Sequence, residues 1–233
     1  MNLLKRLVKL ELVLEIKLIK HILFDLDATL YSKSCVITKN ITKRMIDFVC
    51  SYLNVEESEA KAMRLEGLKN FGTTLEWLIT EHGLSKVGVE NFLSSVHPEE
   101  EKYEVPFDKN LRAFLLSLNT EMSILTNSPY EHAERILKRL KILDLFKVIV
   151  DLRGNNFKGK PEKNAYLKAI SQAGFTIEET LFVDDYIKYV KGFEAIGGKA
   201  VLIDENNVRS DLDCLRISSV YNLKEVLKKL NGI

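Results

Sequence analysis

The chain has 233 residues, of which 34 are basic and 33 acidic, and its formal net charge is +1. This balance argues against a nucleic acid or an anionic membrane as the partner, because both are bound through a surplus of Lys and Arg. The three cysteines, Cys35, Cys50 and Cys214, are odd in number and far apart, which favours reduced thiols in a cytoplasmic protein over a disulfide framework or a zinc site.

Residues 1–19 mix Leu, Val and Ile with Lys and Glu throughout. Neither here nor elsewhere is an apolar run long enough to span a bilayer, and the segment lacks the small-residue cleavage site of a signal peptide. Its leucines fit one face of a helix and also the alternation of a strand, and the periodicity does not choose between them. We interpret residues 1–19 as an extension that serves packing or association, or that has little consequence.

From Lys20 onward, short apolar runs recur, and segments with helical spacing separate the later ones. The runs are HILFDLD, MSILTNS, FKVIVDL, TLFVDD and KAVLID, which begin at His21, Met122, Phe146, Thr180 and Lys199. Strands that alternate with helices are typical of an α/β fold. We therefore predict a doubly wound parallel sheet that is covered by helices on both faces.

Polar residues stand where these runs end, beginning with Asp25 and Asp27 after the first run. Acids are rarely buried without a partner, so two of them at the end of a buried strand indicate a cation site, a catalytic site or both. The alternative is a solvated turn in which Asp27 merely caps the next segment of the chain. Ligands bind beyond the carboxyl ends of parallel strands, so residues far apart in the sequence converge on this edge. The others at this edge are Thr126, Asn127, Asp184 and Asp185.

The connection between the first two strands is too long for one ordinary crossover and is mostly helical in character. We predict that residues 33–105 form a small all-helical cap inserted into a core made of residues 20–32 and 106–233.

A break between two of the predicted cap helices contains Gly72, Thr73 and Thr74. A glycine at a helix break lets the backbone approach a ligand, so these three residues are candidates for substrate specificity. The alternative is that Gly72 ends one helix and the threonines begin the next.

Four stretches, in this order along the chain, resemble the motifs of the haloacid dehalogenase superfamily. They are DLDATL from Asp25, ILTNS from Ile124, GKPEKNAY from Gly159 and LFVDD from Leu181. One motif alone is weak, but four in order, each at a predicted strand end or helix start, make a strong signal. The resemblance covers nearly everything after residue 19. Most members are magnesium-dependent phosphohydrolases, so it implies a Rossmann-like core, a Mg²⁺ cofactor and a small phosphorylated substrate.

The resemblance assigns the chemistry to the two acids of the first motif. Asp25 would attack phosphorus to form an aspartyl-phosphate, which divides a very slow hydrolysis into two easier steps. Asp27 would protonate the leaving oxygen and then deprotonate the attacking water. Mg²⁺ prefers oxygen ligands, and the resemblance implies the carboxylates of Asp25 and Asp185 and the backbone carbonyl of Asp27. Neighbouring side chains of a strand point in opposite directions, so one of Asp184 and Asp185 would bind the metal directly and the other through water or a lysine.

By the same resemblance, Thr126 and Asn127 would bind the phosphate through hydrogen-bond donors at a helix start. Lys160 would neutralise the charge that develops on the transferring group. Each assignment has a plainer alternative. Thr126 could be an ordinary helix cap, and Lys160 a solvated lysine with Lys158 as its rival.

The last motif departs from the family pattern. Many relatives carry a further Asp or Asn four residues after the acid that matches Asp185, where this chain has Tyr189, and Tyr186 stands where a small Ser is frequent. The departure bears on the affinity for metal and not on the reaction class. His97 and His132 have no partner pattern for metal or triad chemistry, and we expect them to be structural or surface residues.

Two looser similarities narrow the choice of substrate class. FGTTLEWLITEHGL from Phe71 and FLSSVHPEEEKYEVPFDKNLR from Phe92 look like the cap and re-entry of the pyrimidine 5'-nucleotidase-like group. Our leading hypothesis is therefore a magnesium-dependent phosphatase for a nucleoside 5'-monophosphate, especially a pyrimidine one. The alternatives are a sugar or other metabolite phosphatase of the same fold, a hydrolytic haloacid dehalogenase, and a non-catalytic phosphate-binding regulatory domain.

Overall fold

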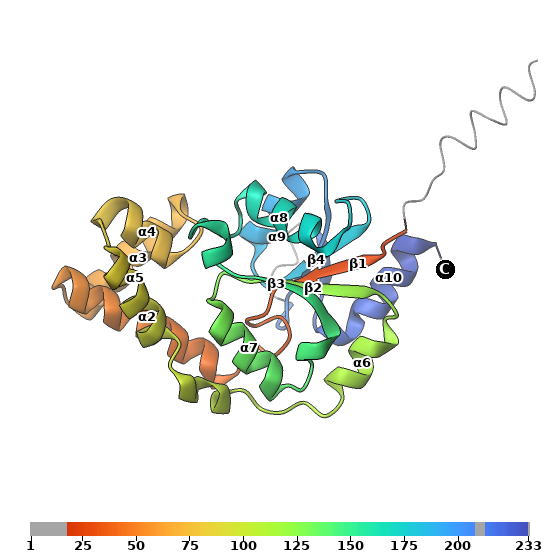
Figure 1. Cartoon of the computed structure of the whole chain (residues 1–233), viewed down its shortest axis with the longest axis horizontal. Helices are drawn as coiled ribbons and strands as arrows, with labels where there is room; N and C mark the ends of the chain where they lie inside the picture. Colours follow the sequence, from red (N-terminus) through yellow and green to blue (C-terminus); the bar gives the residue numbers. More distant parts are fainter. Residues whose placement is uncertain (1–17, 208–212, 233) are drawn as a thin grey trace, which may run out of the picture.

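The structure of the chain is a computed structural model that describes residues 18–207 and 213–232. The interpretation of residues 1–19 therefore falls almost wholly outside the described residues. Figure 1 shows a core built around a sheet and a separate group of helices beside it. This group comes from the long segment between the first two strands.

Six strands of the described residues form one parallel sheet in the order β3-β2-β1-β4-β5-β6. Their bounds are β1 His21–Phe24, β2 Glu121–Leu125, β3 Phe146–Val150, β4 Thr180–Asp184, β5 Lys199–Ile203 and β6 Leu215–Ile217. The chain first extends the sheet on one side of β1 and then crosses to the other side at β4. The crevice beyond the carboxyl ends of β1 and its two neighbours is thus the switch point of the sheet, where ligands bind in such folds.

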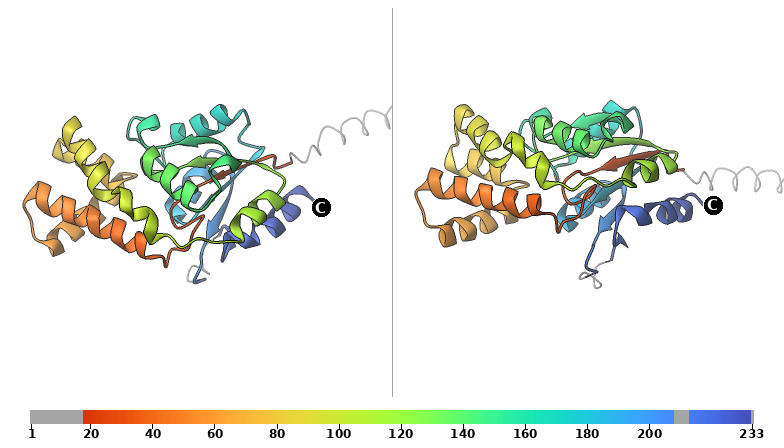
Figure 2. Two further views of the ribbon diagram at one scale, coloured as in Figure 1. Left: turned by 60° about the horizontal axis from the view of Figure 1, so that its bottom comes forward. Right: turned by 90° about the horizontal axis from the view of Figure 1, so that it is seen from below.

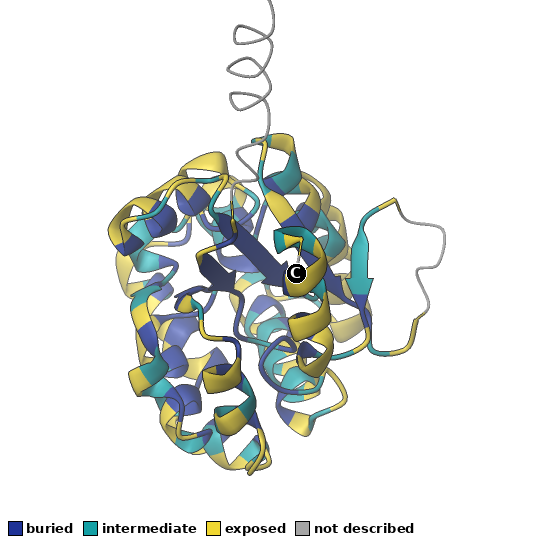
Figure 3. Ribbon diagram, turned by 90° about the vertical axis from the view of Figure 1, so that its right-hand side faces the viewer, coloured by how far each residue is buried: buried dark blue, intermediate teal, exposed yellow. Residues whose placement is uncertain are grey.

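The sheet is buried on both faces because its side chains alternate between two apolar layers. In β1, Ile22 and Phe24 belong to one hydrophobic cluster and Leu23 to the other. Two groups of helices cover these faces: α6 Leu111–Ser117, α7 Tyr130–Arg139 and α10 Leu223–Asn231 on the first, and α8 Lys163–Ala173 and α9 Ile187–Ala195 on the second. Figure 3 shows the buried strands between helices whose outer sides are exposed. The predicted doubly wound parallel sheet is confirmed.

Four helices between β1 and β2 pack on one another and form the cap. They are α2 Val36–Leu53, α3 Glu57–Asn70, α4 Thr74–His82 and α5 Lys86–Val96. Trp77, Leu78 and Phe92 lie in a hydrophobic cluster made almost wholly of cap residues. A Cβ at Gly67 would lie 2.6 Å from the Trp77 indole, so α3 approaches α4 closely only because this residue is glycine. Figure 2 shows the cap beside the core in two further views.

The core also holds the cap through polar contacts from the start of α9. Lys188 Nζ donates to the carbonyls of Leu68 (2.8 Å) and Phe71 (2.9 Å) at the end of α3, where carbonyls lack helical partners. The Tyr189 hydroxyl donates to the Gly72 carbonyl at 2.9 Å. The segment that follows β4 is therefore bonded directly to the break between α3 and α4.

Two expectations from composition can be compared with the structure. The three cysteines are free thiols. Among the helices that the structure describes, none combines the length and the apolar character needed to cross a membrane.

Candidate active site

Lys160 lies at the centre of the candidate site, between the ends of β1 and β4. Its side chain is fully buried, and Nζ donates to Asp25 Oδ1 at 2.6 Å and to Asp184 Oδ2 at 2.7 Å. Burial opposes a charge here, but the charges of Asp184 and Asp25 raise the pKa of Lys160 above its usual range. Lys158, the rival in the sequence, is exposed. The geometry thus brings Lys160, and not Lys158, to the predicted nucleophile.

Three carboxylates meet beside this lysine, and their chemistry fits a magnesium ion. Asp25, Asp184 and Asp185 each offer an oxygen within 4.8 Å of the others. Burial raises the pKa of Asp25 and that of Asp184, the latter to about 6. The charge of Lys160 opposes this rise only in part, and the neighbouring carboxylates add to it. Asp185 accepts from Lys33 Nζ at 2.7 Å. An all-oxygen, strongly anionic set is what Mg²⁺ prefers, so these residues fit the metal that the sequence implied.

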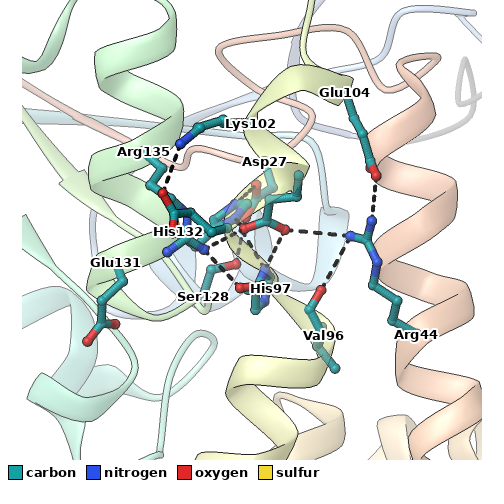
Figure 4. Close-up of polar contacts among 12 residues, drawn as sticks. Asp27, Arg44, Val96, His97, Lys102, Glu104, Ser128, Glu131, His132 and Arg135 are labelled. Carbon is teal, nitrogen blue, oxygen red and sulfur yellow. Dashed lines mark hydrogen bonds and ion pairs between the residues drawn. The ribbon is translucent and has the colours of Figure 1, made fainter.

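Asp27 is held by three donors from the core, of which Ser128 and His132 are labelled in Figure 4. Oδ1 accepts from the Tyr31 hydroxyl at 2.6 Å and lies 2.7 Å from His132 Nε2, and Oδ2 accepts from Ser128 Oγ at 2.7 Å. Burial alone would raise the pKa of Asp27, but the charge and hydrogen bond of His132 hold it well below the usual range. The same pairing overcomes burial at His132 and raises the pKa of that residue to about 10. In the protein without substrate the pair is therefore a carboxylate beside an imidazolium.

The two residues predicted to bind phosphate occupy different positions. Thr126 is buried directly after β2, and its Oγ1 accepts from Ser128 N at 3.0 Å, which leaves its hydroxyl proton free to donate. The Asn127 side chain braces the loop of Lys160: Oδ1 accepts from Lys160 N at 2.8 Å, and Nδ2 donates to Lys160 O at 3.0 Å. Gly159 makes this possible, because a Cβ there would lie 2.0 Å from Asn127 Oδ1.

A cavity of about 370 Å³ lies over these groups, between core and cap. Its core side includes Asp25, Asp27, Asn127, Ser128 and Asp185, and its cap side includes Arg64, Gly72, Thr73 and Thr74. The acids of the first motif and the predicted cap residues therefore share one cavity. Thr126, Lys160 and Asp184 lie behind its wall.

The three cap residues also hold local structure, as the alternative interpretation expected. Thr73 is the N-cap of α4 and accepts from Glu76 N, while buried Thr74 accepts from Arg64 Nε at 2.8 Å. A Cβ at Gly72 would lie 2.5 Å from the Lys160 carbonyl, so the cap backbone touches the loop that contains Lys160. Both interpretations remain compatible with this geometry, and the role in specificity stays a prediction.

Sequence reasoning missed the residues behind Asp27. His132 and His97 are buried, and His132 contacts the predicted acid/base directly, so our expectation of structural or surface histidines overlooked its place in the site. Glu101, also buried, lies 2.5 Å from His132 Nδ1. One signal was available: His132 lies in the first turn of α7, the helix that follows the ILTNS motif at the site.

Comparison with known proteins gives a family match and several matches of fold. The family model described as haloacid dehalogenase-like hydrolase matches residues 22–203. Among solved structures, a HAD phosphatase from Thermococcus onnurineus is 22% identical, with a TM-score of 0.63 over 89% of this chain and 97% of that one. A HAD-hydrolase from Bacillus subtilis bound to magnesium is 16% identical (TM-score 0.62; 91% and 100%). A 2-haloacid dehalogenase from Pseudomonas syringae is 20% identical (TM-score 0.59; 91% and 99%). At these identities the structures show the fold, and the fold hosts more than one reaction.

Proposed function

The chain belongs to the haloacid dehalogenase-like hydrolases, and on that premise we propose that it is a magnesium-dependent phosphatase of a small phosphorylated metabolite. The observation that carries this proposal is the pair Asp25 and Asp27, which line one cavity beside a cluster of carboxylates that fits Mg²⁺. A halide leaves without a proton, so a dehalogenase has no need for an acid at Asp27. A phosphate-binding domain needs neither a nucleophile nor an acid/base.

In the proposed mechanism, Asp27 takes up a proton when the anionic ester binds beside it, because the nearby negative charge favours the protonated carboxyl group. Asp25 attacks phosphorus, the bond from phosphorus to the ester oxygen breaks, and Asp27 gives that oxygen its proton. Water then attacks the aspartyl-phosphate, Asp27 takes a proton from it, and inorganic phosphate leaves with Asp25 restored. Thr126 would donate to a phosphate oxygen, and Lys160 would hold Asp25 in place and offset negative charge. Bound Mg²⁺, held by Asp25, Asp185 and the Asp27 carbonyl with Asp184 nearby, would supply positive charge between the two anions.

We further propose a nucleoside 5'-monophosphate, with a pyrimidine base as first choice. The cavity is in the size range of small-ligand sites. Arg64, on its cap side, donates to Thr74 Oγ1 and to Met45 Sδ, and it forms no ion pair with a described carboxylate. A half-buried guanidinium with spare donors supports a leaving group that carries hydrogen-bond acceptors, such as the carbonyl oxygens of a pyrimidine.

The test is phosphate release from a panel of nucleotides, sugar phosphates and p-nitrophenyl phosphate, with and without Mg²⁺. We expect metal-dependent turnover that Asp25→Asn abolishes, because the amide keeps the shape but lacks the attacking charge. Arg64→Met should lower kcat/KM for the best nucleotide more than for p-nitrophenyl phosphate. Halide release from a 2-haloacid, or an Asp25→Asn variant that still hydrolyses phosphate esters, would contradict the proposal.

A further inference from the structure

A chain of buried polar contacts runs from the cap to Asp27 (Figure 4). His132 Nε2 lies 2.7 Å from Asp27 Oδ1, and His132 Nδ1 lies 2.5 Å from Glu101 Oε1. Both nitrogens of one imidazole thus face a carboxylate oxygen. His132 and Glu101 are completely buried, so these contacts are made without competition from water.

Glu101 is itself fixed by residues from both parts of the protein. It belongs to the short 3-10 helix η1 (Glu99–Glu104), which leads from the cap back to the core. Arg135 of α7 donates to Oε1 at 2.9 Å, while Oε2 lies 3.2 Å from His97 Nδ1 at the end of α5 and 3.7 Å from Arg44 Nη1 of α2. Glu101 therefore contacts two cap helices, α2 and α5, and one core helix, α7.

A metal ion could be imagined among His97, Glu101 and His132, whose ligand atoms lie close together. The guanidinium groups of Arg135 and Arg44 already form ion pairs with the Glu101 carboxylate, at 2.9 and 3.7 Å. A divalent cation placed there would meet two fixed positive charges. The three residues therefore fit a cluster of hydrogen bonds and ion pairs better than a metal site.

We propose that His132 is a positioning residue: clamped between Glu101 and Asp27, it sets the orientation of the Asp27 carboxylate toward the leaving oxygen. Tyr31 also contacts Oδ1 but belongs to the same loop as Asp27, and Ser128 holds only Oδ2. His132 is therefore the residue that holds Oδ1 from outside this loop. Because Glu101 is held by His97 and Arg44, the clamp is complete when the cap is in the position seen here. This inference rests on the proposed function, in which Asp27 is the general acid.

Two substitutions at His132 test its contacts with Glu101 and with Asp27 one at a time. The amide of His132→Asn takes the place of Nδ1 and keeps a donor toward Glu101, but it is too short to reach Asp27. The amide of His132→Gln takes the place of Nε2 and keeps a donor toward Asp27. His21→Asn is the matched control, because His21 is equally buried but lies at the start of β1, away from the cavity.

The kinetic measurement compares phenyl phosphate with p-nitrophenyl phosphate, two esters of similar shape. Phenolate is the poorer leaving group and depends more on a general acid. For His132→Asn we expect kcat/KM to fall about tenfold or more for phenyl phosphate, and at most about threefold for p-nitrophenyl phosphate. His132→Gln should recover most of the difference. His21→Asn should change both esters by the same factor. If His132→Asn does not fold, Glu101→Gln, which alters only the far end of the clamp, should give the same selective loss.

Equal losses for the two esters in the His132→Asn variant would overturn the inference, since a general loosening of the fold has no preference between leaving groups. The crystal structure of this variant is a second test, and it does not require turnover. We expect the Asp27 carboxylate to be rotated relative to its position in the wild type, and an unmoved carboxylate would refute the clamp. If the wild type hydrolyses neither ester, the proposed function fails, while the orientation of Asp27 still decides whether His132 positions it.

Discussion

His21, the first residue of β1, should make the stability of the protein depend on pH. It is completely buried and stacks on Phe175 with ring centroids 4.7 Å apart. Thr180 Oγ1 donates its proton to Thr176 O, so His21 Nδ1, 3.1 Å from the same oxygen, must be the donor in that contact. The other ring nitrogen, Nε2, is buried without a hydrogen-bond partner. A proton added to Nε2 would therefore place an unpaired charge in the core.

Burial, with a smaller contribution from the charge of Lys147, lowers the pKa of His21 from 6.5 to about 4. The native state binds this proton less readily than the unfolded chain, so stability is intact above pH 6.5 and falls as the pH drops towards 4. Between pH 7 and pH 5 the loss from this one group amounts to about 2 kcal/mol.

Urea unfolding of the wild type and of His21→Asn at pH 7 and pH 5 measures this contribution. The asparagine amide retains the donor to Thr180 but does not titrate. The variant should be less stable at both pH values, because it loses the stacked ring, and its free energy of unfolding should fall by about 2 kcal/mol less over this range. Parallel changes in the two proteins would show that His21 does not titrate as its surroundings imply.

Three further predictions concern the site and the cap. Asp185→Asn should raise the Mg²⁺ concentration for half-maximal activity about tenfold or more, whereas an unchanged titration, or a larger shift for Asp184→Asn, would exclude Asp185 as the main ligand. Gly72→Ala should lower kcat about tenfold, because its Cβ would lie 2.5 Å from the Lys160 carbonyl and displace the loop that contains Lys160; unchanged kinetics would mean that this loop adjusts freely. Replacing Thr73 and Thr74 by alanine should lower kcat/KM for the best nucleotide more than for p-nitrophenyl phosphate, and equal losses would assign these threonines to helix capping alone.

Much of the fold was predictable because its signals are local. The apolar run before Asp25 and the similar runs before Thr126 and Asp184 are each followed directly by polar residues, and parallel strands bring such positions to one edge. By contrast, β6 has three residues, Leu215–Ile217, which is too short for a periodic signal, and it was not predicted.

The candidate site was predictable in its members but not in its contacts. The resemblance to the family motif singled out Lys160, whereas spacing alone does not distinguish it from Lys158, since the choice depends on which of them the loop buries. The contact of His132 with Asp27 joins residues 105 positions apart, and that of Glu101 with His132 joins residues 31 positions apart. Such pairs leave no periodic trace in one sequence, because the first arises only when α7 packs beside the end of β1, and the second only when the cap segment returns to the core.

The bonds from the start of α9 to the end of α3 limit how freely the cap can be exchanged. Lys188 follows the candidate metal ligand Asp185 by three residues and donates to the cap carbonyls of Leu68, Lys69 and Phe71. A chimera that received residues 33–105 from another member of the fold would leave this ammonium half-buried without acceptors, unless the graft ended its second helix in the same way. Successful transplantation of specificity would therefore require the turn after β4 to be grafted together with the cap, as one module.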